Sequence, residues 1–597
     1  MKKKKSAMAM NTVKYRGPKP EVKDNSEIKN ADDSKKEETV DLSRSFWLTR
    51  IVFLRSLAFI YFVAFLISFD QNKELIGDNG LLPLKSYLTR IKSNLNGKPN
   101  HQLFMNVPTL YWFLESWNHM DPILDATAIM GMVLSFFVFV TGTANSIILA
   151  SLWILYHTIV NVGQAWFSFG WESQLLETGF LAIWIVPLFN LNKFDYKPNW
   201  LAILGYRFFV ARIMLGAGLI KIRGDKCWHD LTCMNYFFET QPNPNPIAYF
   251  AHPAPEAWHK FETFGNHVVE LICPFLSFIP LRGAALTNGT LQILFQVILI
   301  STGNLSFLNW LTVLPSIWFF DDQVWKKLFS QKTILRLQSE ERILQLKKTD
   351  LTSTLRFLTS LAIGTMLAYL SIPIVQNLLS PRQVMNTSFE PFRIVNTYGA
   401  FGTVTKERTE IILEGSLDQK DWHAYDFKCK PGNLWQAPCL ISPYHYRLDW
   451  LMWFAAFQNH HYNPWLVHLV AKMLVNDPIV DSLLLKNPFK DISPPKFIRA
   501  RHFKYNFSNI GSEEAQKGQW WTRVYIKDYM PILDLKSVQP YLNHFGWKLK
   551  KCECQFAALC VLRSGGLVQS ILVFRVSLPI RREPVFILDS LLENKTQ

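Results

Sequence analysis

Six ionisable residues lie within or directly beside long apolar stretches of this chain: Arg55, Glu172, Glu177, Arg207, Arg212 and Lys221. Charges in an apolar environment are costly, so they are candidates for a functional site. Glu172 and Glu177 share the run 169–179, and either could pair with Arg207 or Arg212 in the next stretch. Such pairs could orient one helix against another, perform acid–base chemistry on a substrate, or form part of an ion path. We favour buried ion pairs, because no partner nucleophile is visible.

Four of the eight cysteines form two close pairs. Five residues separate Cys227 from Cys233, whereas redox-active pairs usually have two between them. This spacing favours a structural disulfide, with an exchange-active pair as the alternative. His229 would be only a third ligand for zinc, so we predict no metal site. Cys429 and Cys439 are predicted to form a second structural disulfide, and Cys273 to be a buried thiol.

Recognisable catalytic and cofactor motifs are absent from the sequence, which contains no Gly-X-Ser-X-Gly, Walker, His-Glu-X-X-His or dinucleotide-binding pattern. We therefore predict no cofactor and no enzymatic activity. The net charge of +16 does not indicate nucleic-acid binding, because part of the basic excess lies beside apolar stretches, in Lys2–Lys5 and in residues 326–356.

These residues are positioned by a series of apolar runs, which predict a polytopic helical membrane domain over residues 46–380. The candidate spans are 51–69, 123–141, 147–165, 173–190, 201–220, 262–280, 286–302, 306–320 and 357–378. Several are short enough to be re-entrant or buried helices. Residues 1–45 are highly charged and are predicted to be a disordered cytosolic leader, followed by a signal anchor at 51–69.

The distribution of Lys and Arg places the N-terminus in the cytosol and residues 70–122, 221–261 and everything after 379 on the other side. The paired cysteines favour an oxidising compartment, the lumen of the endoplasmic reticulum. Asn386 and Asn506 begin N-glycosylation sequons in the same region.

Residues 385–550 have the pattern of a β-rich, sandwich-like domain. The segments 409–413, 422–429 and 520–526 have strand character, whereas 445–457 and 465–475 have helical character. Residues 551–597 form an atypical extension with three further cysteines, Cys552, Cys554 and Cys560, to which we assign no role.

Long motifs across residues 46–550 closely resemble the vertebrate lipase maturation factor family. They include FWLTRIV (46–52), YFVAFLISFDQNKELIGDNGLLP (61–83), FGWESQLLETGFL (169–181), ARIMLGAGLIKIRGDKCWHDLTCM (211–234), ETQPNPNPIAY (239–249), GNLSFLNWLT (303–312), RQVMNTSFEPFRIVNTYGAFGTVTKER (382–408) and CLISPYHYRLDWLMWFAAF (439–457). After about Lys550 the resemblance stops.

The resemblance implies an endoplasmic reticulum membrane protein needed for folding and dimer assembly of secreted lipases. The implied partners are lipoprotein lipase, hepatic lipase and endothelial lipase, with other luminal folding and redox factors as further possibilities. Family members are usually described with five spans, and their luminal loop equivalent to about 221–289 is implicated in lipase binding.

Within this loop we predict client-binding aromatic side chains, because aromatic residues dominate binding energy at interfaces. The candidates are Trp228, Tyr236, Phe237 and Phe238. The alternative is that these rings only pack against the rest of the protein. Two other functions remain open from the residues alone: a membrane-embedded enzyme using the Glu and Arg residues, or a luminal thiol-redox factor using Cys227 and Cys233.

Overall fold

The structure is a computed structural model that describes residues 41–43, 45–95, 99–114, 119–194, 196–346, 351–490 and 492–549. Most of the predicted leader and all of the extension 551–597 lie outside these residues. Leu42 and Ser45 are buried, and the Ser45 hydroxyl donates a hydrogen bond to Asp322 at 2.5 Å. The helical domain therefore includes packed residues before the predicted boundary at 46.

Five described helices are long and apolar enough to cross a membrane. They are α1 (Trp47–Ile76), α4 (Asp121–Thr141), α7 (Trp200–Arg223), α12 (Arg282–Thr302) and α16 (Leu351–Leu379). They indicate a multi-pass membrane protein and confirm the predicted helical membrane region. We call residues 46–380 the helical domain.

Only five of the nine candidate spans correspond to long apolar helices. The remaining four candidate spans form shorter or interrupted helices. These segments are α5 (Ser146–Val162), α6 (Gly170–Ala182) with η4 (Ile183–Ile185), α11 (Glu256–His267) with η5 (Val268–Ile272) and η6 (Cys273–Phe278), and α13 (Leu308–Ser316) with η7 (Ile317–Phe319). Pro187 follows η4 and Pro274 lies in η6. Proline lacks a backbone N–H and disrupts an α-helix, which explains why apolar composition alone overestimated helix length here.

Hydrogen bonds identify which segments meet at the α1 N-terminal end of the helical domain. The Asp322 carboxylate accepts bonds from the backbone N–H groups of Trp47 and Leu48, both at 2.8 Å, and so caps α1. Its neighbour Asp321 pairs with Arg282 at 2.5 Å. Residue 282 therefore lies at the end where α1 begins.

The opposite, α1 C-terminal end contacts the C-terminal part of the chain. The side-chain amide of Gln71 in α1 donates to the carbonyl of His445 at 2.9 Å, and the backbone N–H of Asp225 donates to the carbonyl of Gly402 at 2.9 Å. Gln241 donates to Thr302 at the end of α12. The chain thus passes from one end of the domain to the other between residues 225 and 282, through α11, η5 and η6.

Residues 385–549, which we call the C-terminal domain, contain two antiparallel sheets and several helices. The larger sheet has the order β2-β1-β5-β6, formed by β1 (Arg408–Ser416), β2 (His423–Ala424), β5 (Phe497–Phe507) and β6 (Trp521–Leu533). A smaller sheet pairs β3 (Asp426–Phe427) with β4 (Leu484–Lys486). The helices are α17 (Arg447–Ala455), α18 (Pro464–Met473), α19 (Pro478–Leu483), α20 (Glu513–Gln516) and α21 (Leu535–Phe545). The predicted β-rich region is confirmed.

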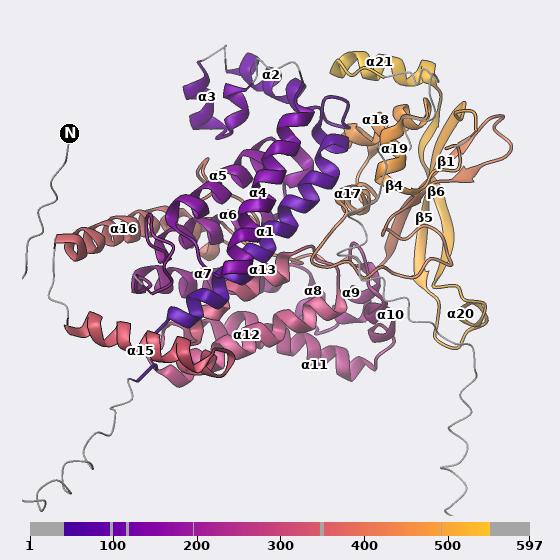
Figure 1. Ribbon diagram of the computed structural model, residues 1–597. Coiled ribbons are helices and arrows are strands. Elements are labelled where there is room, and N and C mark those ends of the chain that lie inside the picture. The colour runs from indigo at the N-terminus through magenta and orange to yellow at the C-terminus, as the bar shows by residue number, and fades with distance from the viewer. Residues whose placement is uncertain are drawn as a thin grey trace, which may run out of the picture.

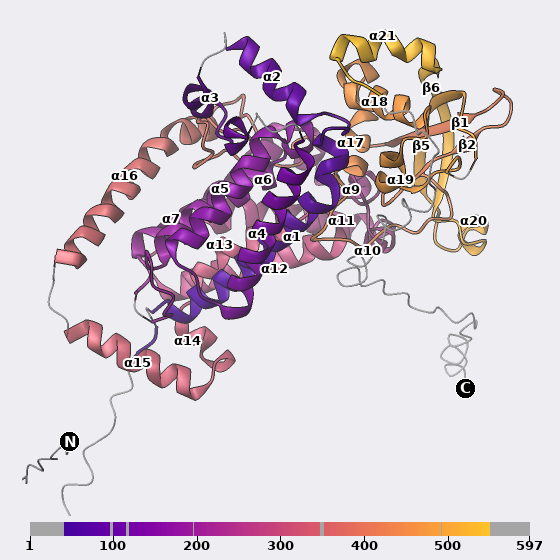
Figure 2. The same cartoon turned by 45° about the horizontal axis from the view of Figure 1, so that its top comes forward.

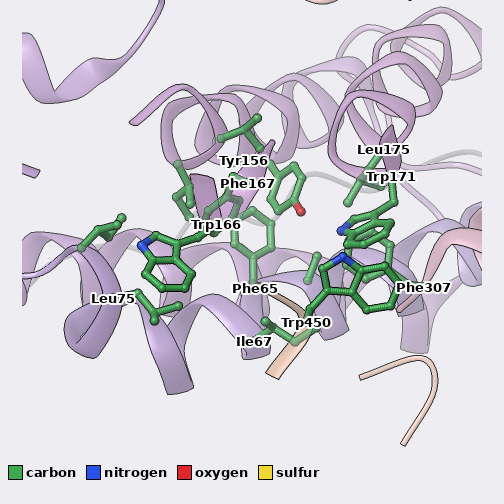
Figure 3. Close-up of a cluster of buried hydrophobic side chains, with 14 of the residues drawn as sticks. Phe65, Ile67, Leu75, Tyr156, Trp166, Phe167, Trp171, Leu175, Phe307 and Trp450 are labelled. Atoms are coloured by element: carbon green, nitrogen blue, oxygen red, sulfur yellow. The ribbon is translucent and has the colours of Figure 1, made fainter. Parts of the chain in front are cut away.

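Figure 1 and Figure 2 both place the large sheet at one end of the helical domain and helix α15 (Gln331–Leu346) at the other. The two domains share one aromatic core. Trp450 of α17 packs edge-on against Trp171 of α6, with ring centroids 5.0 Å apart (Figure 3). The C-terminal domain therefore packs directly against the helices.

Candidate functional site

The predicted client-binding loop folds into three short helices held by a disulfide. These are α8 (Lys226–His229), α9 (Met234–Thr240) and α10 (Pro246–Ala251). Cys227 and Cys233 are joined, and both are buried. A pair that exchanges disulfides with clients must be reached by another thiolate, so this burial favours the structural alternative.

Three of the four predicted client-binding aromatics are buried, which corrects the expectation that they are exposed. Trp228, Phe237 and Phe238 are at most 7% exposed and share a cluster with Val404. The Trp228 indole also donates to the carbonyl of Phe401 at 2.9 Å. The loop turns its rings inward onto residues 401–404, and only Tyr236 remains half-buried.

Apolar exposure instead occurs where α10 meets the large sheet. Phe250 is 60% exposed and Ile247 is 47% exposed. The neighbouring Tyr249 packs against Trp520 and Phe507, with centroids 4.9 and 5.2 Å apart. The loop that is expected to contact clients therefore meets the C-terminal domain at this point.

Trp520 immediately precedes β6, which is an edge strand of the large sheet among the described residues. Val524 and Ile526 on this strand are 67% and 45% exposed. An exposed edge strand presents unpaired backbone groups to which another chain can add a strand. We call Ile247, Phe250, Trp520, Val524 and Ile526 the α10–β6 surface.

Edge strands usually carry features that prevent unwanted pairing, and most of those of β6 lie in its second half, whereas Arg523 is the one charged residue between Trp521 and Tyr525. Its pairing with β5 is irregular opposite residues 498–503, and the strand contains Lys527 and Pro531. From Trp521 to Tyr525 the register with β5 is regular. The first half of β6 is therefore the part that remains suited to accepting a partner strand.

Glu177 of α6 and Arg212 of α7 form a buried ion pair. Glu177 also accepts hydrogen bonds from the Asn396 backbone N–H at 3.1 Å and from the Tyr398 hydroxyl at 2.7 Å. Arg212 donates to the carbonyl of Asn396 at 2.9 Å. The pair thus fastens α6 and α7 to the segment that begins the C-terminal domain.

Glu172 pairs with Arg447 of α17 at 2.7 Å, and both side chains are fully buried. Tyr156 and the Trp171 indole also donate to this carboxylate. Of the two expected partners, Arg207 and Arg212, only Arg212 pairs with one of these carboxylates among the described residues. Arg207 instead donates to the carbonyl of Trp318 at 3.2 Å and lies over the ring of Phe319.

Both carboxylates are surrounded by donors from the protein itself, and neither lines the cavity of about 730 Å³ that lies beside α1 and α15. Within the described residues, no group of three or more His, Cys, Asp or Glu side chains could hold a metal ion. The arrangement is that of structural ion pairs, because every contact of Glu172 and Glu177 described above comes from the protein's own side chains and backbone.

The remaining predicted sites fall on segments where the two domains meet. Asn386 is exposed and its amide donates to the carbonyl of Gly399 at 3.1 Å. Asn506 lies in β5, where its amide donates to Glu239 at 2.9 Å, and Ser508 of its sequon is buried. Asn386 is therefore accessible to a modifying enzyme, whereas Asn506 would have to be modified before this region folds.

Cys429 and Cys439 form the second disulfide. The Asp449 carboxylate accepts hydrogen bonds from the backbone N–H groups of Cys429 and Lys430, at 2.6 and 2.9 Å. Asn304, between α12 and α13, donates to the carbonyl of Cys439 at 2.7 Å. The disulfide therefore lies in a segment held by both domains.

Sequence reasoning missed the residues that connect the domains, above all Arg447, Asn396 and Asn304. Arg447 lies in an aromatic, amphipathic helix, and a cation there is a signal of a buried partner. Nothing in the sequence identified Glu172 as that partner, because the two positions are 275 residues apart.

Comparison with known proteins agrees with this architecture. The profile of the lipase maturation factor transmembrane domain matches residues 48–327, and that of the lipase maturation factor C-terminal domain matches residues 394–531. No solved structure matches the chain significantly.

Two curated relatives named lipase maturation factor 1 are similar over most of their length. That of Bos taurus is 51% identical over 523 residues, covering 85% of this chain and 93% of the relative. That of Homo sapiens is 49% identical, covering 85% and 91%. Lipase maturation factor 2 of Gallus gallus is 28% identical, covering 81% of each chain. This chain belongs to the lipase maturation factor family, and within it lies closer to the factor 1 relatives.

Proposed function

We propose that this protein is a membrane-anchored folding and assembly factor for secreted lipases. It resides in the membrane of the endoplasmic reticulum, with its N-terminus in the cytosol and its C-terminal domain in the lumen. Its clients are lipoprotein lipase, hepatic lipase and endothelial lipase, which it helps to fold, dimerise and become secreted. Support comes from the match of both domains to the family and from relatives whose names state lipase maturation.

The α10–β6 surface is the proposed client-binding surface. An incompletely folded or unassembled lipase exposes apolar side chains and unpaired strands, which are complementary to an apolar patch beside an open strand edge. The single observation that carries this placement is that Phe250 and Val524 are exposed, whereas Trp228, Phe237 and Phe238 are buried.

A rigid connection to the membrane is consistent with this function. The ion pair between Glu172 and Arg447 and the shared aromatic core hold the C-terminal domain against the helices. The client-binding surface is thereby kept at a fixed position relative to the bilayer, where newly translocated lipase chains emerge. Non-catalytic assistance requires no further chemistry at Glu172 or Glu177.

Secretion of lipoprotein lipase from cells lacking this protein tests the proposal. The full chain should restore active, dimeric lipase. A Phe250→Ala/Val524→Lys variant should restore much less and should co-precipitate roughly tenfold less unassembled lipase, as expected for loss of central apolar contacts.

Ile532→Lys is a matched control, because Ile532 is exposed on the same strand beyond Pro531. It should behave like the unmodified chain. Equal loss in both variants would indicate a general effect of charge on β6. Full rescue by Phe250→Ala/Val524→Lys would place the client elsewhere on the protein, and failure of the unmodified chain itself would refute the proposed function.

A further inference from the structure

At the α1 N-terminal end, a cavity of about 730 Å³ lies between α1, the segment 191–194 and the region around the start of α15. This is the end opposite the C-terminal domain, and the proposed client-binding surface does not extend to it (Figure 2). Helix α15 is fixed there by Ile334 and Leu337, which are buried in a cluster with Trp47 and Phe194. The walls of the cavity therefore belong to packed elements.

Four basic side chains line this cavity, Arg55, Lys193, Lys332 and Arg336, and none of the described residues that line it is acidic. Arg55 and Arg336 donate hydrogen bonds to neutral oxygens, the carbonyl of Val140 and the amide of Asn192, both at 3.2 Å. Burial holds the pKa of Lys193 below its ordinary value, and the positive charge of Arg55 lowers that pKa further. Among the described residues, the cavity is therefore lined by positive charge without a carboxylate.

Other basic residues at this end do have acidic partners within the described residues. Arg282 pairs with Asp321, and Lys197 pairs with Glu341. Asp321 and Glu341 are thus used in ion pairs outside the cavity. The four cations that line it have no ion pair with a described carboxylate, and they surround a space that an anion could fill.

The remaining lining is largely apolar, including Ile51, Val52, Leu191, Leu328 and Phe329. Arg55 lies eight residues beyond the start of α1, which places it near the boundary between the hydrocarbon core and the headgroup region. Helix α15 also exposes Leu335 and Ile343, 52% and 58%, as expected for a helix at the membrane surface. Cations next to apolar side chains at this depth suit a molecule that has both an anionic head and an apolar tail.

We propose that this cavity binds the headgroup of an acidic phospholipid from the adjacent leaflet, with its acyl chains along the apolar surface of α1. The phosphate contacts the guanidinium and ammonium groups of the four basic residues. Bound lipid would join α15 to α1 and so stabilise the end of the helical domain that is farthest from the C-terminal domain.

Native mass spectrometry of the full-length protein tests the assignment. The protein is released in a mild detergent from nanodiscs that contain equal amounts of phosphatidylserine and phosphatidylcholine with the same acyl chains. We expect one phosphatidylserine to remain bound in preference to phosphatidylcholine. A Lys332→Glu/Arg336→Glu variant should reduce its retention at least tenfold.

Lys326→Glu/Lys327→Glu is the matched control, because it changes the charge equally at the same end but outside the cavity lining. Its retention of phosphatidylserine should change by less than twofold. Equal loss in both variants, or equal retention of the two lipids by the unmodified protein, would overturn the proposal.

Inorganic phosphate distinguishes a lipid site from a site for a soluble anion. Millimolar phosphate should leave bound phosphatidylserine in place, and complete displacement by it would refute the lipid assignment. If the double variant does not fold, Lys193→Ala replaces it, and unchanged retention by that variant would also count against the proposal.

Discussion

The Nη1 atom of Arg447 lies 2.7 Å from Oε1 of Glu172, and neither side chain is exposed to solvent. One residue belongs to the C-terminal domain and the other to the helical domain. Arg447 also donates to the carbonyl of Trp166 at 2.6 Å and lies over the ring of Phe167. This single cation therefore contacts several parts of the helical domain and orients α17 against it.

Removing one partner of this pair should destabilise the protein strongly. Glu172→Gln leaves the Arg447 guanidinium buried without a counter-charge, which should cost about 3–5 kcal/mol. The apparent unfolding temperature of the detergent-solubilised full-length chain and its protease sensitivity between the domains would measure this effect. The double variant Glu172→Gln/Arg447→Met should lose less than the sum of the two single variants.

Glu513→Gln is the appropriate control, because the pair between Glu513 and Lys517 is exposed on α20 and should be worth under about 1 kcal/mol. A stable, fully folded Glu172→Gln protein that nevertheless failed to support lipase secretion would contradict the structural role and favour an active role for this carboxylate.

The sequence was sufficient to predict the local structure of much of the chain, because helices and strands leave periodic patterns of apolar residues. Residues 357–378 are predicted apolar and lie within α16, and 409–413 lies within β1. The strand β5 has the alternating burial of a two-sided strand, with Arg499, Arg501 and Lys504 at its less buried positions, and it is not among the predicted strands. Local patterns were thus informative where composition and periodicity agreed.

Contacts between distant segments could not be predicted in the same way. The carboxylate of Glu172 was correctly expected to be buried, but several basic residues could have been its partner, and spacing along the sequence favoured those in the next helix. The aromatic residues at 228, 237 and 238 have the composition of an interface, and only the position of residues 401–404 shows that they are internal. Which side of a short helix is covered depends on the rest of the fold.

Accessibility at residue 283 should reveal how the segment between α7 and α12 crosses the membrane. A Gly283→Cys variant should be labelled by a membrane-impermeant maleimide in sealed microsomes, because Arg282 lies beside Asp321 at the α1 N-terminal end, which we place in the cytosol. Gly283 has open space around its Cα, so the substitution should not disturb α12.

Lys420→Cys, on an exposed loop of the C-terminal domain, should be labelled only after detergent is added. Both variants need a background in which the four cysteines outside the two disulfides are replaced by serine: Cys273, Cys552, Cys554 and Cys560. Protection of residue 283 would contradict the crossing through α11, η5 and η6 and would favour one continuous luminal loop.

The disulfide between Cys429 and Cys439 should stabilise the segment that Asn304 and Asp449 hold in place. Replacing both cysteines with serine should lower the stability of the C-terminal domain by about 2–4 kcal/mol, because the open chain gains conformational entropy when it unfolds. Limited proteolysis of residues 429–445 would report the loss. Thiol alkylation followed by mass spectrometry, without reduction, should find both cysteines of the native protein unmodified, and alkylation of both would refute the assignment.

Acidification should destabilise the C-terminal domain because it contains buried neutral histidines. His468 is 2% exposed, its ring stacks on Trp547, and its Nδ1 lies 2.8 Å from the carbonyl of Leu81. Burial lowers its pKa to about 4 from an ordinary value near 6.5. Burial also lowers the pKa of His445, and the charge of Arg447 adds to that effect.

Stability falls on acidification because the folded and unfolded chains protonate His468 at different pH values. Above pH 6.5 both folded and unfolded chains hold His468 neutral, so this residue adds no pH dependence. Between pH 6.5 and 4 the unfolded chain takes up a proton that the folded chain does not, and stability falls as the pH falls. The loss attributable to His468 should reach on the order of 2–3 kcal/mol near pH 4.

Unfolding of the full-length protein as a function of pH, compared with a His468→Gln variant, measures this contribution. Glutamine can still donate to the Leu81 carbonyl but does not titrate in this range. The variant should therefore show a shallower decline between pH 6.5 and 4, even if its stability at neutral pH is lower because the stacking on Trp547 is lost. Identical pH profiles for the two proteins would show that His468 has the same pKa in the folded and unfolded chains, which would contradict its burial as a neutral ring.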